Sequence, residues 1–300
     1  MNIFLLFKKA YWHLFKTMPC EMILKNKWDE YRKIERRYYN KNYDITGINV
    51  NNPDVIFNRN IFVYWDKGFE NAPIIVKKCY QRLLDIAPVD WNIISLSDEN
   101  IKDYVKLPDF VEKMLLKNEI LRANYSDLLR TALLYFYGGI WVDSTCLFTK
   151  EIPQSILDDD FFMFSIRNTV PYTPMMFENW FIRANKGNFV LGRVLENMLY
   201  YFNKTKTPKK IYFVWFYILS ALYRHDECAR NLMDKISYCG NQDALLMSVF
   251  YGLETNYNEI LWHQITNKCF VQKLTYKYDK ALEQLEKDIF LKHILNDLKN

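Results

Sequence analysis

Histidine and cysteine, the commonest protein ligands of zinc, are scarce in this chain. It has four histidines and six cysteines among 300 residues. The cysteines form no Cys-x-x-Cys pair, and the histidines are scattered, which argues against a structural zinc site. Isolated cysteines in apolar surroundings are typical of reduced core residues. A cytoplasmic protein without a disulfide framework is therefore expected.

Long hydrophobic runs are also lacking. The longest uncharged run covers the thirteen residues 211–223, whereas a transmembrane helix needs roughly 20 apolar residues. Residues 1–7 are apolar, but Lys8 and Lys9 follow them. A signal peptide has the reverse order, with its charge before its apolar region, so export is not expected.

Positive charge is confined to the beginning of the chain. Residues 1–43 contain ten Lys or Arg and four Asp or Glu, a net charge of +6, whereas the remainder contains 30 and 31. The main body thus lacks the basic stripe that nucleic-acid binding requires, and no nucleic-acid partner is expected. Residues 1–17 mix aromatic and basic side chains, as in a helix that lies on an anionic membrane. A helix packed on its own domain is the alternative.

The chain divides near residue 52. Residues 25–41 are charged and favour a helix, and Asn, Gly and Pro accumulate over residues 40–52. We therefore predict a basic helical extension over residues 1–52 and a main domain over residues 53–300. Together with the charge pattern, this places the protein in the cytoplasm, with peripheral contact to the inner face of the cell membrane through residues 1–17.

Strand and helix patterns alternate after this boundary. Residues 61–65 and 90–96 have strand composition, and Pro73 opens a helix between them at a position that suits proline. This order predicts an α/β fold with a parallel, doubly wound sheet, in which ligands bind beyond the carboxyl ends of the strands. Further elements are expected downstream: strands over 161–166 and 268–276, and helices over 189–202, 209–223 and 279–298.

Residues 125–147 are the most informative segment. Ser126 is a suitable N-cap for a helix whose apolar residues repeat at helical spacing, and Gly138 and Gly139 provide a left-handed turn to end it. A short strand over 140–142 then leads to Asp143. Asp127 and Asp143 should therefore lie on either side of one helix and face the same crevice.

These carboxylates suit the chemistry of nucleotide-sugar binding. A strand-end carboxylate such as Asp143 can accept hydrogen bonds from ribose hydroxyls or hold Mg²⁺ or Mn²⁺ beside a diphosphate. The planar guanidinium of Arg130 can pair with Asp127 or with phosphate oxygens. The alternative for these two residues is an ordinary surface ion pair at three-residue spacing.

The same segment resembles a known family. YSDLLR at residues 125–130, together with GGIWVDST at 138–145, is similar to the central motif of the capsular polysaccharide synthesis protein family. Residues 62–68 resemble the family's opening strand, and residues 273–277 its closing segment. The resemblance covers residues 55–280. This family is related to glycosyltransferases with a DxD motif, among them yeast-type mannosyltransferases and sugar-transferring clostridial toxins.

The resemblance implies a GT-A fold with a mainly parallel central sheet and a helical C-terminal part. It implies that Tyr64 or Trp65 lies near the donor's base and that Asp127 and Arg130 contact its sugar or phosphate. Asp143 matches the first carboxylate of the DxD motif and is the implied metal ligand. The implied catalytic residues are Asp143, Asp127 and Arg130, and the implied donor-binding set is Tyr64, Trp65, Asp127, Arg130, Gly139, Asp143 and Thr145.

Thr145 stands where relatives have the second carboxylate, which puts dependence on Mn²⁺ or Mg²⁺ in doubt. A hydroxyl is a much weaker ligand for a divalent cation than a carboxylate. His263 or Asp243 would have to supply a further ligand. A single carboxylate together with the donor diphosphate is the other arrangement that would hold the ion.

The acceptor is expected between residues 171 and 188. Asn179 and Trp180, with Tyr172 and Glu178, can form a loop over a sugar ring and exclude water. A core-facing aromatic cluster is the alternative interpretation of the same residues.

Together these features predict a glycosyltransferase that moves a sugar from a nucleotide-sugar donor, most simply a UDP-sugar. The expected acceptor is a capsular or related surface polysaccharide, or its lipid-linked oligosaccharide precursor. A second hypothesis is a nucleotide-sugar-binding protein of the same fold that has lost transfer activity. A sugar-phosphate transferase is disfavoured, because the phosphate-binding glycine loops of such enzymes are absent.

Overall fold

The computed structural model describes residues 20–50, 52–166, 173–205, 211–237 and 239–296. The predicted membrane-contacting segment 1–17 and Tyr172 lie outside these ranges.

The described chain is built around a five-stranded sheet with the order β2–β1–β3–β6–β5. Its strands are β1 (Asn60–Tyr64), β2 (Asn92–Leu96), β3 (Gly139–Asp143), β5 (Phe161–Ser165) and β6 (Phe177–Ala184). β1 is parallel to β2 and β3, whereas β6 is antiparallel to β3 and β5. The predicted α/β fold with a parallel core is confirmed, but the sheet is mixed.

Within this sheet β6 runs against the other four strands, and chain connectivity explains its antiparallel pairing with β5. β1 is followed by α3 (Ile74–Ile86) before the chain returns in β2, and a crossover helix of this kind allows parallel strands. β5 and β6 are neighbours both in sequence and in the sheet, with no helix assigned between them in the described residues. Neighbouring strands joined without a crossover run antiparallel.

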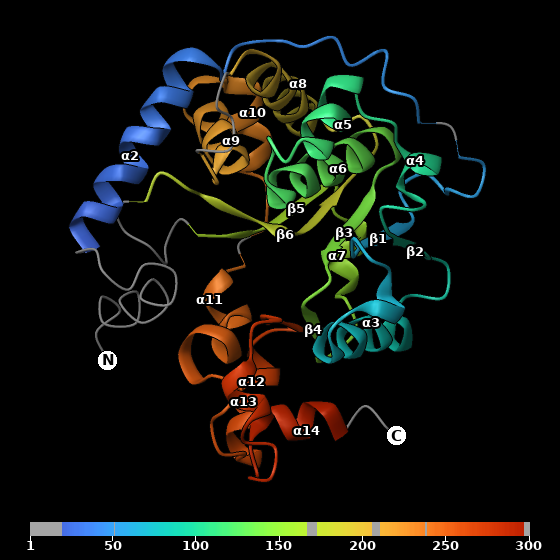
Figure 1. Ribbon diagram of the computed structural model, residues 1–300, viewed down its shortest axis with the longest axis vertical. Helices are drawn as coiled ribbons and strands as arrows, with labels where there is room; N and C mark the ends of the chain where they lie inside the picture. The colour runs from blue at the N-terminus through green and yellow to red at the C-terminus, as the bar shows by residue number, and fades with distance from the viewer. Residues whose placement is uncertain (1–19, 51, 167–172, 206–210, 238, 297–300) are drawn as a thin grey trace.

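Helices cover one face of the central sheet (Figure 1). The central helix α6 (Arg122–Tyr137) lies against β1, β3 and β6 and is itself covered by α8 (Phe189–Lys204). Because it is enclosed on both sides, α6 is buried around most of its circumference, and its buried residues include the polar side chains of Asp127 and Arg130. The other helices on this side are α4 (Ile101–Tyr104), α5 (Asp109–Leu116), α9 (Val214–His225) and α10 (Glu227–Met233).

The helix predicted over residues 25–41 is α2 (Cys20–Arg37), and it packs against α9. The rings of Tyr31 and Tyr217 meet edge to face with centroids 6.1 Å apart, and the Tyr217 hydroxyl donates to Glu30. The described part of the N-terminal segment is thus attached to the helical layer.

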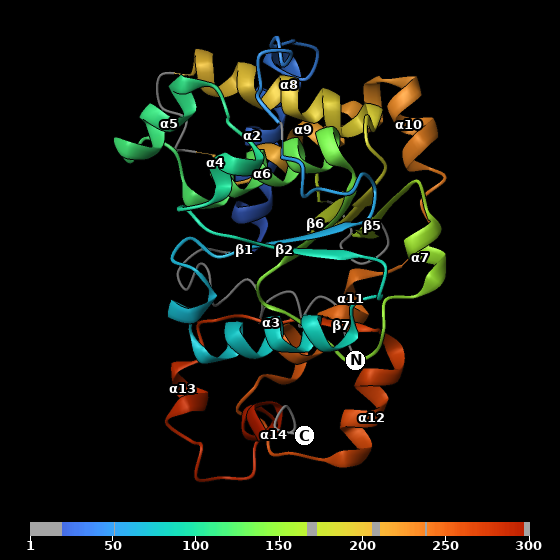
Figure 2. The ribbon, with the colours of Figure 1, turned by 90° about the vertical axis from the view of Figure 1, so that its right-hand side faces the viewer.

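The other face of the sheet is covered by α3 and by residues 241–296 (Figure 2). β4 (Cys146–Phe148) pairs antiparallel with β7 (Val271–Lys273) in a second, two-stranded sheet. The smaller elements here are η1 (Phe69–Asn71), α7 (Gln154–Asp158), α11 (Asn241–Ala244), the π-helical turn η3 (Leu246–Tyr251), α12 (Glu259–Lys268), α13 (Asp279–Leu282) and α14 (Phe290–Asn296).

Two helix predictions were wrong in detail. The central helix begins at Arg122, so Ser126 is inside it and is not its N-cap. The continuous helix predicted over residues 279–298 is divided into α13 and α14. The amides of Phe290 and Leu291 donate to the carbonyls of Thr255 and Leu253, so the chain cannot continue as one helix from α13 into α14. Tertiary hydrogen bonds here override the helical periodicity of the sequence.

Candidate functional site

A cavity of about 1210 Å³ opens beyond the carboxyl ends of β1 and β3. Its wall combines Tyr64 and Asp143 at these strand ends with residues of α6, α9, η3 and β7. Ligands in open α/β sheets bind at this place. The predicted site residues Tyr64, Trp65, Asp127, Arg130, Asp143, Asn179 and Trp180 all line the cavity. The loop predicted over residues 171–188 is wrong, however, because Asn179 and Trp180 are buried residues of strand β6.

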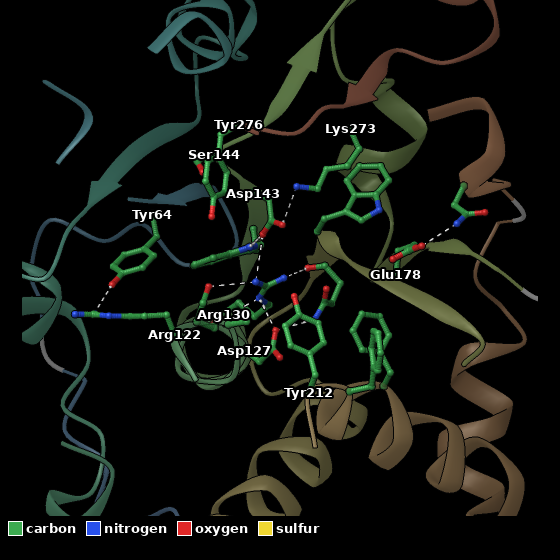
Figure 3. Close-up of a pocket in the computed structure, with 18 of the residues that line it drawn as sticks. Tyr64, Arg122, Asp127, Arg130, Asp143, Ser144, Glu178, Tyr212, Lys273 and Tyr276 are labelled. Atoms are coloured by element: carbon green, nitrogen blue, oxygen red, sulfur yellow. Dashed lines mark hydrogen bonds and ion pairs between the residues drawn. The ribbon is translucent and has the colours of Figure 1, made fainter. Parts of the chain in front are cut away.

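Asp143 is the last residue of β3, and three donors hold its carboxylate (Figure 3). Oδ1 lies 3.2 Å from Arg130 Nη2 and accepts a 2.9 Å hydrogen bond from Trp141 Nε1. Trp141 is two residues earlier in the strand, so its side chain lies on the same face. Oδ2 lies 3.1 Å from Lys273 Nζ. The carboxylate is fixed in position, yet its side chain remains 24% exposed.

The Asp143–Lys273 pair is ionised at neutral pH. Burial favours the neutral form of Asp143, but the charges of Arg130 and Lys273 outweigh it and hold the pKa of this carboxyl below its ordinary value. Burial likewise acts to lower the pKa of Lys273, but Asp143 outweighs it and raises the pKa above its ordinary value. The two charges therefore stabilise each other.

Arg130 and Asp127 lie one turn apart on α6 and are buried, with side-chain exposures of 6% and 8%. Arg130 Nε lies 3.4 Å from Asp127 Oδ1, and the same guanidinium donates to the Asn179 carbonyl and to Ser126 Oγ. Asn179 Nδ2 donates in turn to Asp127 Oδ1 over 2.8 Å. The surface ion pair considered from the sequence is therefore wrong. Arg130 links α6, β3 and β6 beneath Asp143.

Aromatic rings form one wall of the cavity. The Tyr64 hydroxyl donates to Asp98, which also pairs with Arg122 at 2.7 Å. The ring of Trp65 meets that of Tyr276 edge to face, with centroids 5.5 Å apart. These faces suit the planar base of a nucleotide.

Another part of the wall is apolar and contains two buried ionisable groups. Glu178 accepts a 2.8 Å hydrogen bond from Asn241, and burial raises the pKa of Glu178. The Lys27 ammonium lies 4.3 Å from the centroid of the Phe213 ring, and burial lowers the pKa of Lys27 to about 7. The apolar residues of this wall are Ile166, Met175, Phe213, Phe216, Leu245 and Val249.

Two predicted donor residues are not part of the cavity wall. Gly139 begins β3, at the opposite end of the strand from Asp143. Its φ is +114°, and a Cβ there would lie 2.3 Å from the Asn60 carbonyl oxygen, so its role is close packing of backbone against β1. Thr145 is buried, and its hydroxyl accepts a hydrogen bond from Lys273.

The two suggested additional metal ligands are not in the cavity wall either. His263 is exposed beside Glu259. Asp243 does not line the cavity, although the preceding residue, Gln242, does.

Lys273 lines the cavity but was not predicted as a site residue, although the segment that contains it, residues 273–277, was part of the family resemblance. One signal was present, because Lys273 stands between apolar Phe270, Val271 and Leu274, where a buried lysine needs a charged partner. Arg122 and Tyr212, which also line the cavity, carry no comparable signal.

The model of the capsular polysaccharide synthesis protein family matches residues 14–294 of this chain. The chain belongs to this family. The family resemblance seen in the central motif is thus confirmed, and the match includes every candidate site residue named above.

Curated relatives with matching segments are fungal. One is "O-glycosyltransferase braB" of Annulohypoxylon truncatum, 27% identical over 160 residues, which are 47% of this chain and 37% of that protein. Another is "Probable glycosyltransferase FCK3" of Fusarium pseudograminearum, 26% identical over 158 residues, which are 48% of this chain and 39% of that protein. The match thus spans less than half the length of each relative.

A solved structure titled "PaToxG Glycosyltransferase" is similar at 14% identity and a TM-score of 0.40, over 71% of this chain and 83% of that one. Within the described residues, no helix is both long and apolar enough to cross a membrane.

Proposed function

We propose that this protein is a glycosyltransferase that moves a sugar from a nucleotide-sugar donor, a UDP-sugar, to a hydroxyl group of a surface polysaccharide or its lipid-linked precursor. The observation that carries the proposal is the fixed, ionised Asp143 at the end of β3, which faces a large cavity in a member of the capsular polysaccharide synthesis protein family. The name of the Annulohypoxylon truncatum relative, an O-glycosyltransferase, supports transfer of a sugar to oxygen.

The cavity offers separate places for the parts of such a donor. The wall formed by Trp65 and Tyr276 suits the base, in agreement with a GT-A nucleotide-binding domain. Asp143 can accept hydrogen bonds from ribose or sugar hydroxyls, and the cationic side chains of Arg122 and Lys273 border the space where a diphosphate would lie.

The transfer replaces one bond to the anomeric carbon with another. The bond from that carbon to the β-phosphate oxygen breaks, and its electron pair stays on the nucleoside diphosphate. The acceptor hydroxyl oxygen forms the new bond, and its proton leaves to a donor phosphate oxygen or to solvent. A site that excludes water favours this outcome over hydrolysis of the donor.

The acceptor fits the apolar part of the cavity. Trp180 is buried with its ring stacked on Phe164 at 4.4 Å, and its Nε1 has no hydrogen-bond partner among the described residues. Because Nε1 is buried, an acceptor sugar would contact the part of the Trp180 side chain that lines the cavity. Glu178 offers a carboxyl group to another hydroxyl, and the surrounding apolar side chains suit the lipid part of a lipid-linked glycan.

The first test is donor hydrolysis and sugar transfer by the purified protein with a panel of UDP-, GDP- and CMP-sugars and a lipid-linked acceptor fraction. Turnover of one donor is expected. Asp143→Asn should lower kcat/KM by roughly 100-fold or more, since a preorganised charge at the reacting groups is removed. Asp90→Asn is the matched control, because Asp90 lies on the surface in a pair with Arg59. Wild-type activity in Asp143→Asn would disprove the site.

A nucleotide-sugar-binding protein without transfer activity is the second candidate. It is favoured by one observation, the replacement of the second carboxylate of the motif by Thr145, whose hydroxyl is engaged by Lys273. Saturable nucleotide binding without any turnover in the donor panel would support this candidate.

A further inference from the structure

The residues around Asp143 do not fit the divalent cation that a DxD-type transferase would hold. Both carboxylate oxygens already face cations, Arg130 at 3.2 Å and Lys273 at 3.1 Å. A Mg²⁺ ion needs oxygen ligands at about 2.0–2.1 Å, and here it would lie against two positive charges. The described residues also include no cluster of three or more His, Cys, Asp or Glu side chains suited to a metal.

Lys273 lies where it can connect the motif to a diphosphate. Its Nζ lies 3.1 Å from Asp143 Oδ2 and donates to Thr145 Oγ1, so it spans the two positions that carry carboxylates in a DxD motif. These contacts use two of its three N–H groups. The ammonium also borders the cavity, with its side chain 20% exposed, so its third N–H is available to a ligand there.

The backbone fixes this arrangement. Lys273 pairs with Cys146 in the β4–β7 sheet, and the amide of Leu274 donates to the Thr145 carbonyl over 2.8 Å. The ammonium is therefore held relative to Asp143 before any ligand binds. A preorganised charge of this kind stabilises developing negative charge without the cost of reorganisation.

The replacement of the second carboxylate by Thr145 has a consistent physical reason. A carboxylate at this position would give Lys273 a second negative partner and would draw the ammonium away from a ligand. The threonine hydroxyl accepts a hydrogen bond but adds no charge, so one positive charge in contact with Asp143 remains shared with the cavity.

We propose that the Lys273 ammonium, held between Asp143 and Thr145, contacts the donor diphosphate in place of a divalent cation, so that donor binding and transfer need no metal. This rests on the proposed glycosyltransferase function. When the bond between the anomeric carbon and the phosphate oxygen breaks, the electron pair stays on the nucleoside diphosphate, and Lys273 faces that charge without being consumed.

The direct test is calorimetric titration with UDP and with uridine, each in EDTA and in Mn²⁺. The wild-type protein should bind UDP equally well in both conditions. Lys273→Met should weaken UDP binding by roughly tenfold or more and leave uridine binding unchanged, because uridine has no phosphate. Lys273→Arg should restore part of the loss. Lys268→Met is the matched control, since this exposed lysine at the end of α12 does not line the cavity.

A double variant tests whether a metal site can be created where Lys273 now lies. Thr145→Asp combined with Lys273→Met adds a second carboxylate beside Asp143 and removes the ammonium. It should bind Mn²⁺, detected by electron paramagnetic resonance, and should bind UDP at least tenfold more tightly in Mn²⁺ than in EDTA. The wild-type protein should show neither effect.

Two failures can be distinguished. Wild-type binding of UDP that needs Mn²⁺, or unchanged UDP affinity in Lys273→Met, would overturn the role of Lys273 and leave the glycosyltransferase proposal in place. A wild-type protein that binds no UDP, GDP or nucleotide sugar in either condition would overturn both.

Discussion

Asp127 and Asp143 share the guanidinium of Arg130 and have opposite pKa shifts. Asp143 also faces Lys273 and accepts a bond from Trp141, so its charged form is favoured. Asp127 is more deeply buried, and desolvation raises its pKa to about 6 in spite of Arg130 and a hydrogen bond from Asn179. The positive charge of this network is therefore directed toward the carboxylate that faces the cavity.

Asp127 should make the stability of the protein depend on pH. A carboxyl whose pKa is about 6 in the folded state and 3.8 when unfolded binds more protons when folded between these values. The contribution of Asp127 to the free energy of unfolding should then fall as pH rises from about 4 to 6, by up to about 3 kcal/mol, since one pKa unit is about 1.4 kcal/mol. Asp127→Asn should lack this fall, as measured by urea unfolding at a series of pH values.

Asp143→Asn is the contrasting variant. The folded pKa of Asp143 is lowered, so its ionised form contributes stability above the unfolded pKa of 3.8, and that contribution is lost as pH falls below it. Removing Asp143 should therefore cost stability at neutral pH. For Asp127, the contradicting outcome is a free energy of unfolding that changes with pH in the same way in the wild type and in Asp127→Asn. The pKa of Asp127 would then be the same in the folded and unfolded states.

At the scale of the element, the junction of α6 and β3 decides where Asp143 lies. Gly138 ends α6 with φ +70°, and Gly139 begins β3 with φ +114°. The sequence predicted this left-handed turn, because only glycine adopts two successive positive φ values without strain. It did not predict the second reason for Gly139, the close approach of the β1 backbone at Asn60.

Substitution of Gly139 should therefore lower the free energy of unfolding more than substitution of a glycine that has a positive φ but no close neighbour. Gly139→Ala adds a Cβ 2.3 Å from a backbone oxygen to an unfavourable φ, and we expect a loss of about 3 kcal/mol or more. Gly187→Ala is the control, since Gly187 has φ +74° and nothing within 4 Å of the added Cβ, so about 1 kcal/mol is expected. Denaturant unfolding measures both losses, and equal losses would refute the packing argument.

Other elements could not be derived from local pattern. Serine is a residue type that often caps helices, but the Ser126 hydroxyl lies within α6 and accepts a hydrogen bond from Arg130. The division of residues 279–298 follows from backbone bonds to residues 253–255, which no local window contains. Periodicity reports the apolar face of a segment, whereas tertiary hydrogen bonds decide where the segment ends.

At the scale of the whole molecule, the site is assembled from residues far apart in the chain. Its wall extends from Lys27 in α2 to Tyr276 beyond β7. The central motif could be found from sequence because its residues are contiguous. For Lys273 the local sequence indicates only that a lysine among apolar residues needs a charged partner. That this partner is Asp143 depends on the register of β4 with β7. The domain boundary at residue 52 stays a prediction.

An aromatic cluster joins the two sheets and so controls the position of Lys273. Phe270 directly precedes β7, and its ring lies 5.6 Å from that of Phe181 in β6 and 6.2 Å from that of Phe148 in β4. Phe270→Ala should destabilise the protein by about 3–5 kcal/mol through the cavity that it leaves. It should also weaken UDP binding roughly tenfold, equivalent to about 1.4 kcal/mol, because β7 loses its attachment to the central sheet.

Phe202→Ala separates these two effects. Phe202 is also buried, but it lies in α8 and does not line the cavity. The substitution should therefore cost a similar free energy of unfolding and leave UDP affinity at the wild-type level. If both variants lost affinity equally, the loss would follow global stability, and the aromatic cluster would have no particular part in positioning Lys273. If only Phe270→Ala loses affinity, packing between the two sheets sets the geometry of the phosphate-facing charge.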